Sequence, residues 1–293
     1  MHKDNSFRDL AELNLAILFM STSGALGRFI DLPVPVIICT RAIIAGFIIF
    51  LLCKWKRFDF RIKKQDRRTL FVSGLLMGLH WITYFYALKL SNVAIGMISI
   101  FTYPVITTIL EPFILRTKLQ VIHLFLGISV LVGVFFLIPE FNFQHEHTKA
   151  IGLGILSAIL YSLRNIISKS KIREYNGSIL MFYQLLVISV LLVPFYFIDS
   201  GTGWNEQLPA ILMLSILTTA IGHTWFLHSF KKFSVTSASI ISSLQLVYGI
   251  IIGMIFLKEF PQVSTIIGGT LILMTVIVES VISYRKNNKA GIK

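Results

Sequence analysis

The sequence predicts an all-α integral membrane protein in which ten transmembrane helices form two inverted five-helix repeats. Two observations lead to this prediction. The 293 residues are 55% hydrophobic and only 14% charged, with a mean hydropathy of +0.77, whereas a soluble domain carries about 25% charged residues. In addition, the segment 87–113 resembles the segment 229–256, half a chain length later.

Apolar runs of close to twenty residues recur from one end of the chain to the other. Such a run is long enough to cross a hydrocarbon core of about 30 Å as a helix. We expect no soluble domain, because the segments between these runs are short. The predicted spans are residues 12–29, 34–53, 69–88, 92–114, 119–138, 150–168, 178–198, 208–229, 235–257 and 262–283.

The distribution of positive charge predicts the orientation of these spans. Most of the 27 Lys and Arg residues fall in the loops on one side, above all in the basic loop 54–68. Because Lys and Arg accumulate in cytoplasmic loops, both termini are expected to face the cytoplasm in a multi-pass protein of the cytoplasmic membrane. Topology and anionic lipid thus account for the net charge of +13, and nucleic acid is not an expected partner.

The repeat predicts the domain organisation. A first five-helix unit covers residues 1–141 and a second covers residues 149–285. Five is an odd number, so the second unit enters the membrane from the opposite side, and Lys89 falls outside while its counterpart Lys231 falls inside. Internal repeats of inverted topology are typical of secondary transporters.

Polar residues inside the spans predict a central cavity. A polar side chain within a membrane is costly unless it faces protein or water, and here the polar residues follow helical spacing in spans 1, 3, 4, 6, 8 and 9. Spans 5 and 10 are nearly devoid of them and are expected at the periphery. The candidate substrate-binding residues are Arg41, His80, Tyr84, Tyr103, Tyr161, Arg164, Asn165, His223, Trp225 and Gln245.

The two arginines and two histidines among these candidates could serve the structure of the protein and not bind substrate. Arg41 and Arg164 cannot lose their charge, and the middle of each span lacks Asp and Glu, since Glu111 and Glu279 lie toward the inner ends. Each arginine must therefore bind carbonyls, water or an anion, or extend to the interface. The histidines could bind substrate, relay protons or serve only in packing.

Signals for enzymatic chemistry are weak. The HEH at residues 145–147 lacks the second histidine spacing of a zinc protease. His223 and His228 are five residues apart, so they do not share a helix face for a metal. The sequence also lacks a P-loop and a dinucleotide fingerprint. We therefore expect no enzyme activity, no metal and no cofactor.

Several segments resemble the EamA-type branch of the drug/metabolite transporter superfamily. They are CTRAIIAGF with Arg41, YFYALKLSNVAIG followed by TYPVITTILEPF with Pro104, and LKEFPQVSTIIGG with Glu259. The resemblance covers nearly the whole chain. The sequence departs from the pattern of this family at two places. In the first repeat, residues 116–118 stand where a Glu is usual, and in the second repeat, residues 246–247 stand where a Pro is usual. The resemblance implies alternating access around a midplane cavity and export of amino acids or related metabolites.

The sequence therefore predicts a carrier for a small, partly apolar metabolite, with a membrane-embedded enzyme or lipid-handling protein using the intramembrane histidines as the alternative. The expected partners are a small-molecule substrate and the lipid bilayer, and a homodimer is left open. If transport is coupled to protons, His80 or His223 is the expected proton carrier.

Overall fold

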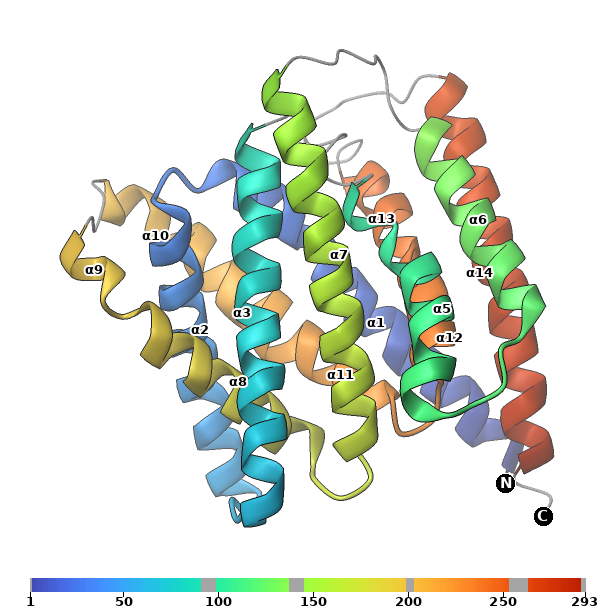
Figure 1. The fold of residues 1–293 in the computed structure, drawn as a ribbon, viewed down its shortest axis with the longest axis horizontal. Helices are drawn as coiled ribbons and strands as arrows, with labels where there is room; N and C mark the ends of the chain where they lie inside the picture. Colours follow the sequence, from blue (N-terminus) through green and yellow to red (C-terminus); the bar gives the residue numbers. More distant parts are fainter. Residues whose placement is uncertain (1, 91–98, 137–144, 199–202, 253–262, 291–293) are drawn as a thin grey trace.

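The computed structural model is all-helical over the residues it describes, which are 2–90, 99–136, 145–198, 203–252 and 263–290 (Figure 1). The helices of the first half are α1 (His2–Phe29), α2 (Val34–Trp55), η1 (Lys64–Asp66), α3 (Arg67–Leu90), α5 (Tyr103–Leu115) and α6 (Val121–Phe136). Those of the second half are α7 (His145–Lys171), α8 (Gly177–Leu192), α9 (Phe195–Ile198), α10 (Trp204–Met213), η2 (Leu214–His223), α11 (Thr224–Ser229), α12 (Val235–Ser242), α13 (Leu244–Ile252) and α14 (Val263–Ala290).

The helices are those of a membrane protein. Within the described residues, seven helices are long and apolar enough to cross a membrane, and α5 and α6 are shorter apolar helices. Each predicted span overlaps one or more helices, and parts of the spans 92–114, 119–138, 235–257 and 262–283 lie outside the described residues. The helices stand side by side, and α1 begins at the same end of the bundle at which α14 ends (Figure 1).

Three predicted spans depart from regular α-helix along their length. The span 178–198 breaks between α8 and α9 at Pro194, which has no N–H to donate and restricts the residue before it. The span 208–229 changes from α-helix to π-helix over Leu214–His223 and back again. In the span 235–257, α12 ends at Ser242 and α13 begins at Leu244.

Helices α6 and α14 run together along one edge of the bundle (Figure 1). Their outer faces are apolar and exposed, with Phe125 at 64% and Met274 at 60%, in agreement with the peripheral position expected for spans 5 and 10. Gly133 lets the two backbones approach closely. A Cβ atom at this position would lie 2.7 Å from Ile272 Cγ1 and 3.0 Å from the Gly268 carbonyl oxygen.

We expect Gly133→Ala to lower the unfolding temperature of the purified protein in detergent. Alanine favours a helix over glycine by about 1 kcal/mol, but forcing a methyl against the α14 backbone costs about 1–3 kcal/mol. Gly152→Ala is the matched control, because nothing lies within 4 Å of a Cβ atom there, and it should leave the unfolding temperature equal or raised. An equal rise in both variants would show that α6 and α14 do not pack as described.

Candidate functional site

Arg41 lies fully buried in α2 and is held by two contacts. Its Nε donates a hydrogen bond to Thr219 Oγ1 at 2.5 Å, and its Cζ lies 3.8 Å from the centroid of the Trp81 ring. Both terminal nitrogens, Nη1 and Nη2, are buried with no hydrogen-bond partner among the described residues. The guanidinium is therefore held through its Nε and its face, while its two terminal N–H₂ groups have no partner among the described residues.

The π-helix η2 supplies two of the groups around Arg41. Thr219 Oγ1 donates back to the carbonyl of Leu214, five residues earlier, at 3.0 Å, so the hydroxyl oxygen can accept from the Arg41 guanidinium. At the end of the same helix, the His223 ring lies edge to face with Trp81, with centroids 5.4 Å apart. Single stretches of π-helix occur frequently at functional sites. This one determines on which side of the helix Thr219 and His223 lie.

His80 and Tyr161 form the other side of the site. Their rings stack with centroids 4.3 Å apart. The Ser157 hydroxyl donates its only proton to the His80 carbonyl at 2.8 Å, so we assign the His80 Nδ1, 2.8 Å from Ser157 Oγ, as the donor to that oxygen. Nε2 of the neutral ring is then an acceptor. The buried Tyr161 hydroxyl lies beside the side chain of Asn165.

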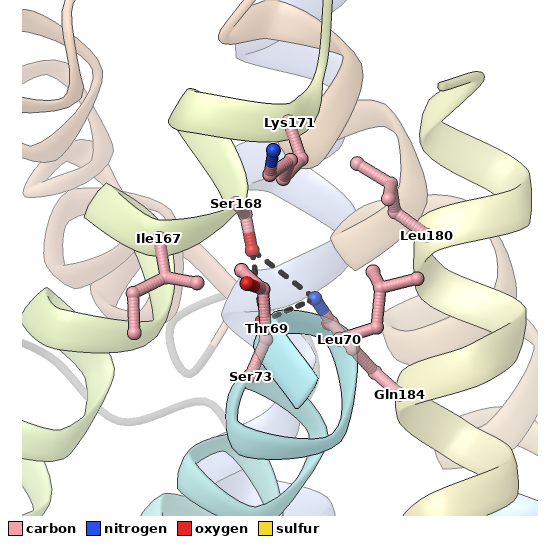
Figure 2. Close-up of a pocket in the computed structure, with 8 residues that line it drawn as sticks. All are labelled: Thr69, Leu70, Ser73, Ile167, Ser168, Lys171, Leu180 and Gln184. Carbon is pink, nitrogen blue, oxygen red and sulfur yellow. Dashed lines mark hydrogen bonds between the residues drawn. The ribbon is translucent and has the colours of Figure 1, made fainter. Parts of the chain in front are cut away.

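Arg164 of α7 is also fully buried, but its guanidinium is occupied. Nε and Nη2 both donate to Gln184 Oε1, at 3.0 and 2.5 Å, and Nη1 donates to Asn165 Oδ1 at 2.9 Å. Gln184 in turn donates from Nε2 to Ser73 Oγ at 2.8 Å and Ser168 Oγ at 3.1 Å. Figure 2 shows these last bonds at the wall of a small pocket between α3, α7 and α8.

The two buried arginines therefore differ in what they can do. The ion pairs of the described residues include neither of them. Arg164 has acceptors on three of its nitrogens, which suits a structural role. Arg41 has one, so a carboxylate or another planar anion could accept two parallel hydrogen bonds from it in a dry, aromatic environment.

The remaining predicted site residues are distributed unevenly. Tyr84 stacks beyond His80, with centroids 6.2 Å apart, and Tyr103 lies edge to face with Tyr161 at 5.2 Å. The amide nitrogen of Asn165 is buried beside the Tyr161 hydroxyl. Trp225 does not join this group, because it is 41% exposed and packs on Phe19. Gln245 is half-buried near the start of α13.

Three residues of the site were not among the sequence-based candidates. They are Trp81 and Thr219, which hold Arg41, and Gln184, which holds Arg164. Trp81 neighbours His80 in sequence, and Thr219 belongs to the same polar stripe as His223. The sequence therefore contained weak indications that these two residues belong to the site. Nothing in the sequence alone indicates which polar residue of a stripe pairs with which arginine.

Several polar contacts between the two halves of the chain lie at the end of the bundle where α7 meets α8. Asp66 of η1 lies 2.7 Å from Lys171 Nζ and accepts from the Tyr175 hydroxyl at 2.5 Å. At the exposed edge, Lys63 Nζ donates to Glu174 Oε2 at 2.9 Å, and this hydrogen bond lowers the pKa of the Glu174 carboxyl. These contacts close that end of the bundle.

A second tie at the same end joins α5 to α12. Both carboxylate oxygens of the buried Glu111 accept from backbone N–H groups, of Val235 at 2.9 Å and of Thr236 at 2.7 Å. The first N–H groups of a helix have no partner within the helix, and a negative charge is favourable there. Glu111 therefore fixes the start of α12 from the other half of the chain.

Comparison with known proteins identifies the family. The model of the EamA-like transporter family matches residues 13–138 and again residues 148–281. The chain belongs to the EamA-like transporter family. It is similar to the pseudopaline exporter CntI of Pseudomonas aeruginosa, with 22% identity over 90% of this chain and 93% of that protein.

Two further comparisons agree with this assignment. The S-adenosylmethionine uptake transporter of Rickettsia conorii is 22% identical over 69% of this EamA-like chain and 68% of its own length. A solved crystal structure superposes with a TM-score of 0.80 at 16% identity, covering 95% of this chain and 98% of the other. That likeness shows a shared fold.

We expect Gln184→Leu to destabilise the purified protein by about 2–3 kcal/mol, because it removes the acceptor of two hydrogen bonds from a buried charge. Thermal unfolding in detergent measures this. Ser243→Ala is the control, since the buried Ser243 hydroxyl has no partner among the described residues, and it should unfold like the unmodified protein. Equal unfolding temperatures for Gln184→Leu and Ser243→Ala would contradict the structural role of Arg164.

Proposed function

We propose that this EamA-like protein moves a small, partly apolar metabolite that carries an acidic group across the cytoplasmic membrane, and that it exports it. An amino acid or a related compound fits this description. The single observation that carries the proposal is the state of Arg41, a buried guanidinium with two unpartnered nitrogens inside an aromatic enclosure. A charge in that position is favourable when an anion binds to it.

The surroundings of Arg41 support the substrate class. Trp81, Tyr161 and His223 present ring faces and edges to the site, which favours an apolar or planar part of the solute. His223 Nδ1 is buried without a partner among the described residues, and the buried Tyr161 hydroxyl has the side chain of Asn165 beside it. A solute with one acidic group and a few polar atoms would satisfy them, and this pattern is typical of small-molecule sites.

The transport mechanism proposed here is alternating access between the units 1–141 and 149–285, arranged as inverted repeats of five spans each with both termini in the cytoplasm. The ties at Asp66 and at Glu111 join the two units at one end of the bundle and would have to break when that end opens. The named relatives include an exporter and an uptake transporter. The proposed direction rests on the resemblance described above.

The alternative is a membrane-embedded enzyme or lipid-handling protein that uses His80 and His223. It predicts a bound metal or a reaction product, whereas the proposed carrier predicts solute movement. Stoichiometric zinc or iron in the purified protein, found by elemental analysis, would favour the alternative.

Candidate substrates can be found by an untargeted metabolomic comparison of cells that overexpress the protein with cells that lack its gene. Flux of the compounds that differ is then measured in proteoliposomes containing only this protein. Absence of flux for all of them would refute the proposal.

Arg41 is the residue at which we expect the largest effect on flux. Arg41→Lys should reduce flux, because an ammonium cannot form two parallel hydrogen bonds, and Arg41→Ala should reduce it further. Loss of a hydrogen bond to a charged group costs about 1.5–3 kcal/mol, or roughly ten- to a hundredfold in affinity. Trp225→Ala, on the exposed side of α11, is the control and should retain flux.

Unfolding temperatures of the same preparations separate anchoring from a structural role. If Arg41 serves mainly to join α2 to Trp81 and Thr219, the unfolding temperature of Arg41→Ala should fall together with flux. If it anchors the substrate, flux falls while the unfolding temperature stays close to that of the unmodified protein. Full flux in Arg41→Ala would exclude the anchoring role.

A further inference from the structure

Two buried positive charges act on the aromatic enclosure formed by Trp81, Tyr161 and His223. Arg41 of α2 and Arg164 of α7 are both fully buried, and both lie close enough to Tyr161 to interact with it electrostatically. The hydrogen bonds of Arg164 go to amide oxygens, which carry no net charge. A neutral oxygen satisfies the geometry of a guanidinium and leaves its charge uncompensated. The field inside the enclosure is therefore positive.

The groups close to these two arginines do not cancel that field. Among the described residues, the groups able to carry a negative charge within electrostatic reach are the phenols of Tyr84 and Tyr161 for Arg41, and the phenol of Tyr161 for Arg164. A phenol is neutral near pH 7. The compensating negative charge at Arg41 therefore has to come from the ligand.

The carboxylates in the part of the chain that the structure describes have other partners or lie at the surface. Glu111 accepts from the backbone at the start of α12, and Asp66 pairs with Lys171. Glu279 of α14 is fully buried and lies 3.4 Å from Nε2 of His123 in α6. The other acidic side chains for which the structure gives a burial are partly or fully exposed. A carboxylate that could receive the ammonium group of a ligand is thus missing from the described part of the enclosure.

This charge balance distinguishes among acidic solutes. In an amino acid the ammonium is attached to the carbon next to the carboxylate, so a carboxylate bound to Arg41 brings the ammonium close to the guanidinium. Like charges at such a separation repel each other strongly in a buried site, and repulsion of this kind is a common source of specificity. A ligand with net negative charge is therefore favoured over a zwitterion or a cation.

We propose that the solute bound at Arg41 is an organic anion without a free ammonium group, namely an aromatic or branched carboxylic acid whose amino group is absent or acylated. This inference rests on the proposed function and narrows its substrate class from amino acids to their deaminated or N-acylated relatives. The neutral polar atoms of the site agree with it. Nε2 of His80, an acceptor in the tautomer assigned above, can accept from the N–H of an acylated amine or from a hydroxyl.

The test compares four probes that share a phenyl ring on a short carbon chain and differ in charge at pH 7. Two are anions, 3-phenylpropionate and N-acetyl-L-phenylalanine. L-phenylalanine is the zwitterion and 2-phenylethylamine is the cation. Binding to the full-length protein in detergent is measured as the rise of its unfolding temperature with probe concentration, because a ligand that binds the folded state stabilises it.

Both anions should bind at least about tenfold more tightly than L-phenylalanine, and 2-phenylethylamine should leave the unfolding temperature unchanged. Arg41→Lys should weaken binding of the anions about tenfold or more, because the ammonium lacks the planar fork. Arg61→Lys, at an exposed arginine of the loop 54–68, is the matched control and should bind them like the unmodified protein. Binding of L-phenylalanine as tight as that of 3-phenylpropionate would overturn the inference, as would the absence of a shift with either anion.

A charge introduced beside Arg41 tests the cause of this preference. Thr219→Asp places a carboxylate where the Thr219 hydroxyl accepts from Arg41 Nε, whereas Thr219→Asn has the same shape without the charge. The preference for 3-phenylpropionate over L-phenylalanine should be at least about tenfold smaller in Thr219→Asp than in Thr219→Asn. Equal preferences would overturn the inference. If these variants do not fold, the comparison of the four probes on the unmodified protein still decides.

Flux of the same probes in proteoliposomes separates this inference from the proposed function. Tighter binding and faster flux of L-phenylalanine would overturn the inference and leave the proposed transport intact. Binding of the two anions without flux of any probe would support the anion site and count against the proposed transport.

Discussion

A guanidinium that cannot lose its charge lies in the interior of this bundle, and much of the structure around it serves to hold it there. Arg41 of α2 is stacked on Trp81 of α3 and bonded to Thr219 of the π-helix η2. Removing a charge from water is expensive, and a stacked ring with one hydroxyl compensates only in part. The two nitrogens without a partner among the described residues are the basis of the proposed anion site.

The second buried arginine shows what complete compensation requires. Arg164 is surrounded by amide oxygens from Gln184 and Asn165, and the Gln184 amide is itself held by two serine hydroxyls. Four side chains are committed to one guanidinium. Satisfied networks of this kind make a core rigid and specific, whereas near Arg41 the Nδ1 of His223 is buried without a partner among the described residues.

The sequence predicted the helical membrane fold because span length and apolarity depend only on bilayer thickness. It also selected His80, Tyr161 and both arginines, because buried polar residues in a membrane must face the interior. It could not predict the π-helix η2, because the change from i→i−4 to i→i−5 hydrogen bonds depends on how the helix packs against its neighbours. For the same reason it could not foresee that Trp225 lies on the exposed side of α11.

The pairing of His123 with Glu279 was beyond sequence reasoning for a different reason. Each residue lies near the end of an otherwise apolar helix, where extension to the interface is the usual outcome. In the structure both side chains are buried, with His123 Nε2 lying 3.4 Å from Glu279 Oε2. Contacts between helices that are far apart in the chain decide burial here, and hydropathy along one helix contains no information about them.

The occupation of the Arg41 site by the transported solute can be measured directly through Trp81. The chain has four tryptophans, so replacing Trp55, Trp204 and Trp225 by phenylalanine leaves one reporter beneath the guanidinium. Titration with the solute identified by flux should change the Trp81 fluorescence saturably, and Arg41→Ala in the same background should abolish the change. Continued flux of that solute with no change in Trp81 fluorescence would contradict the account.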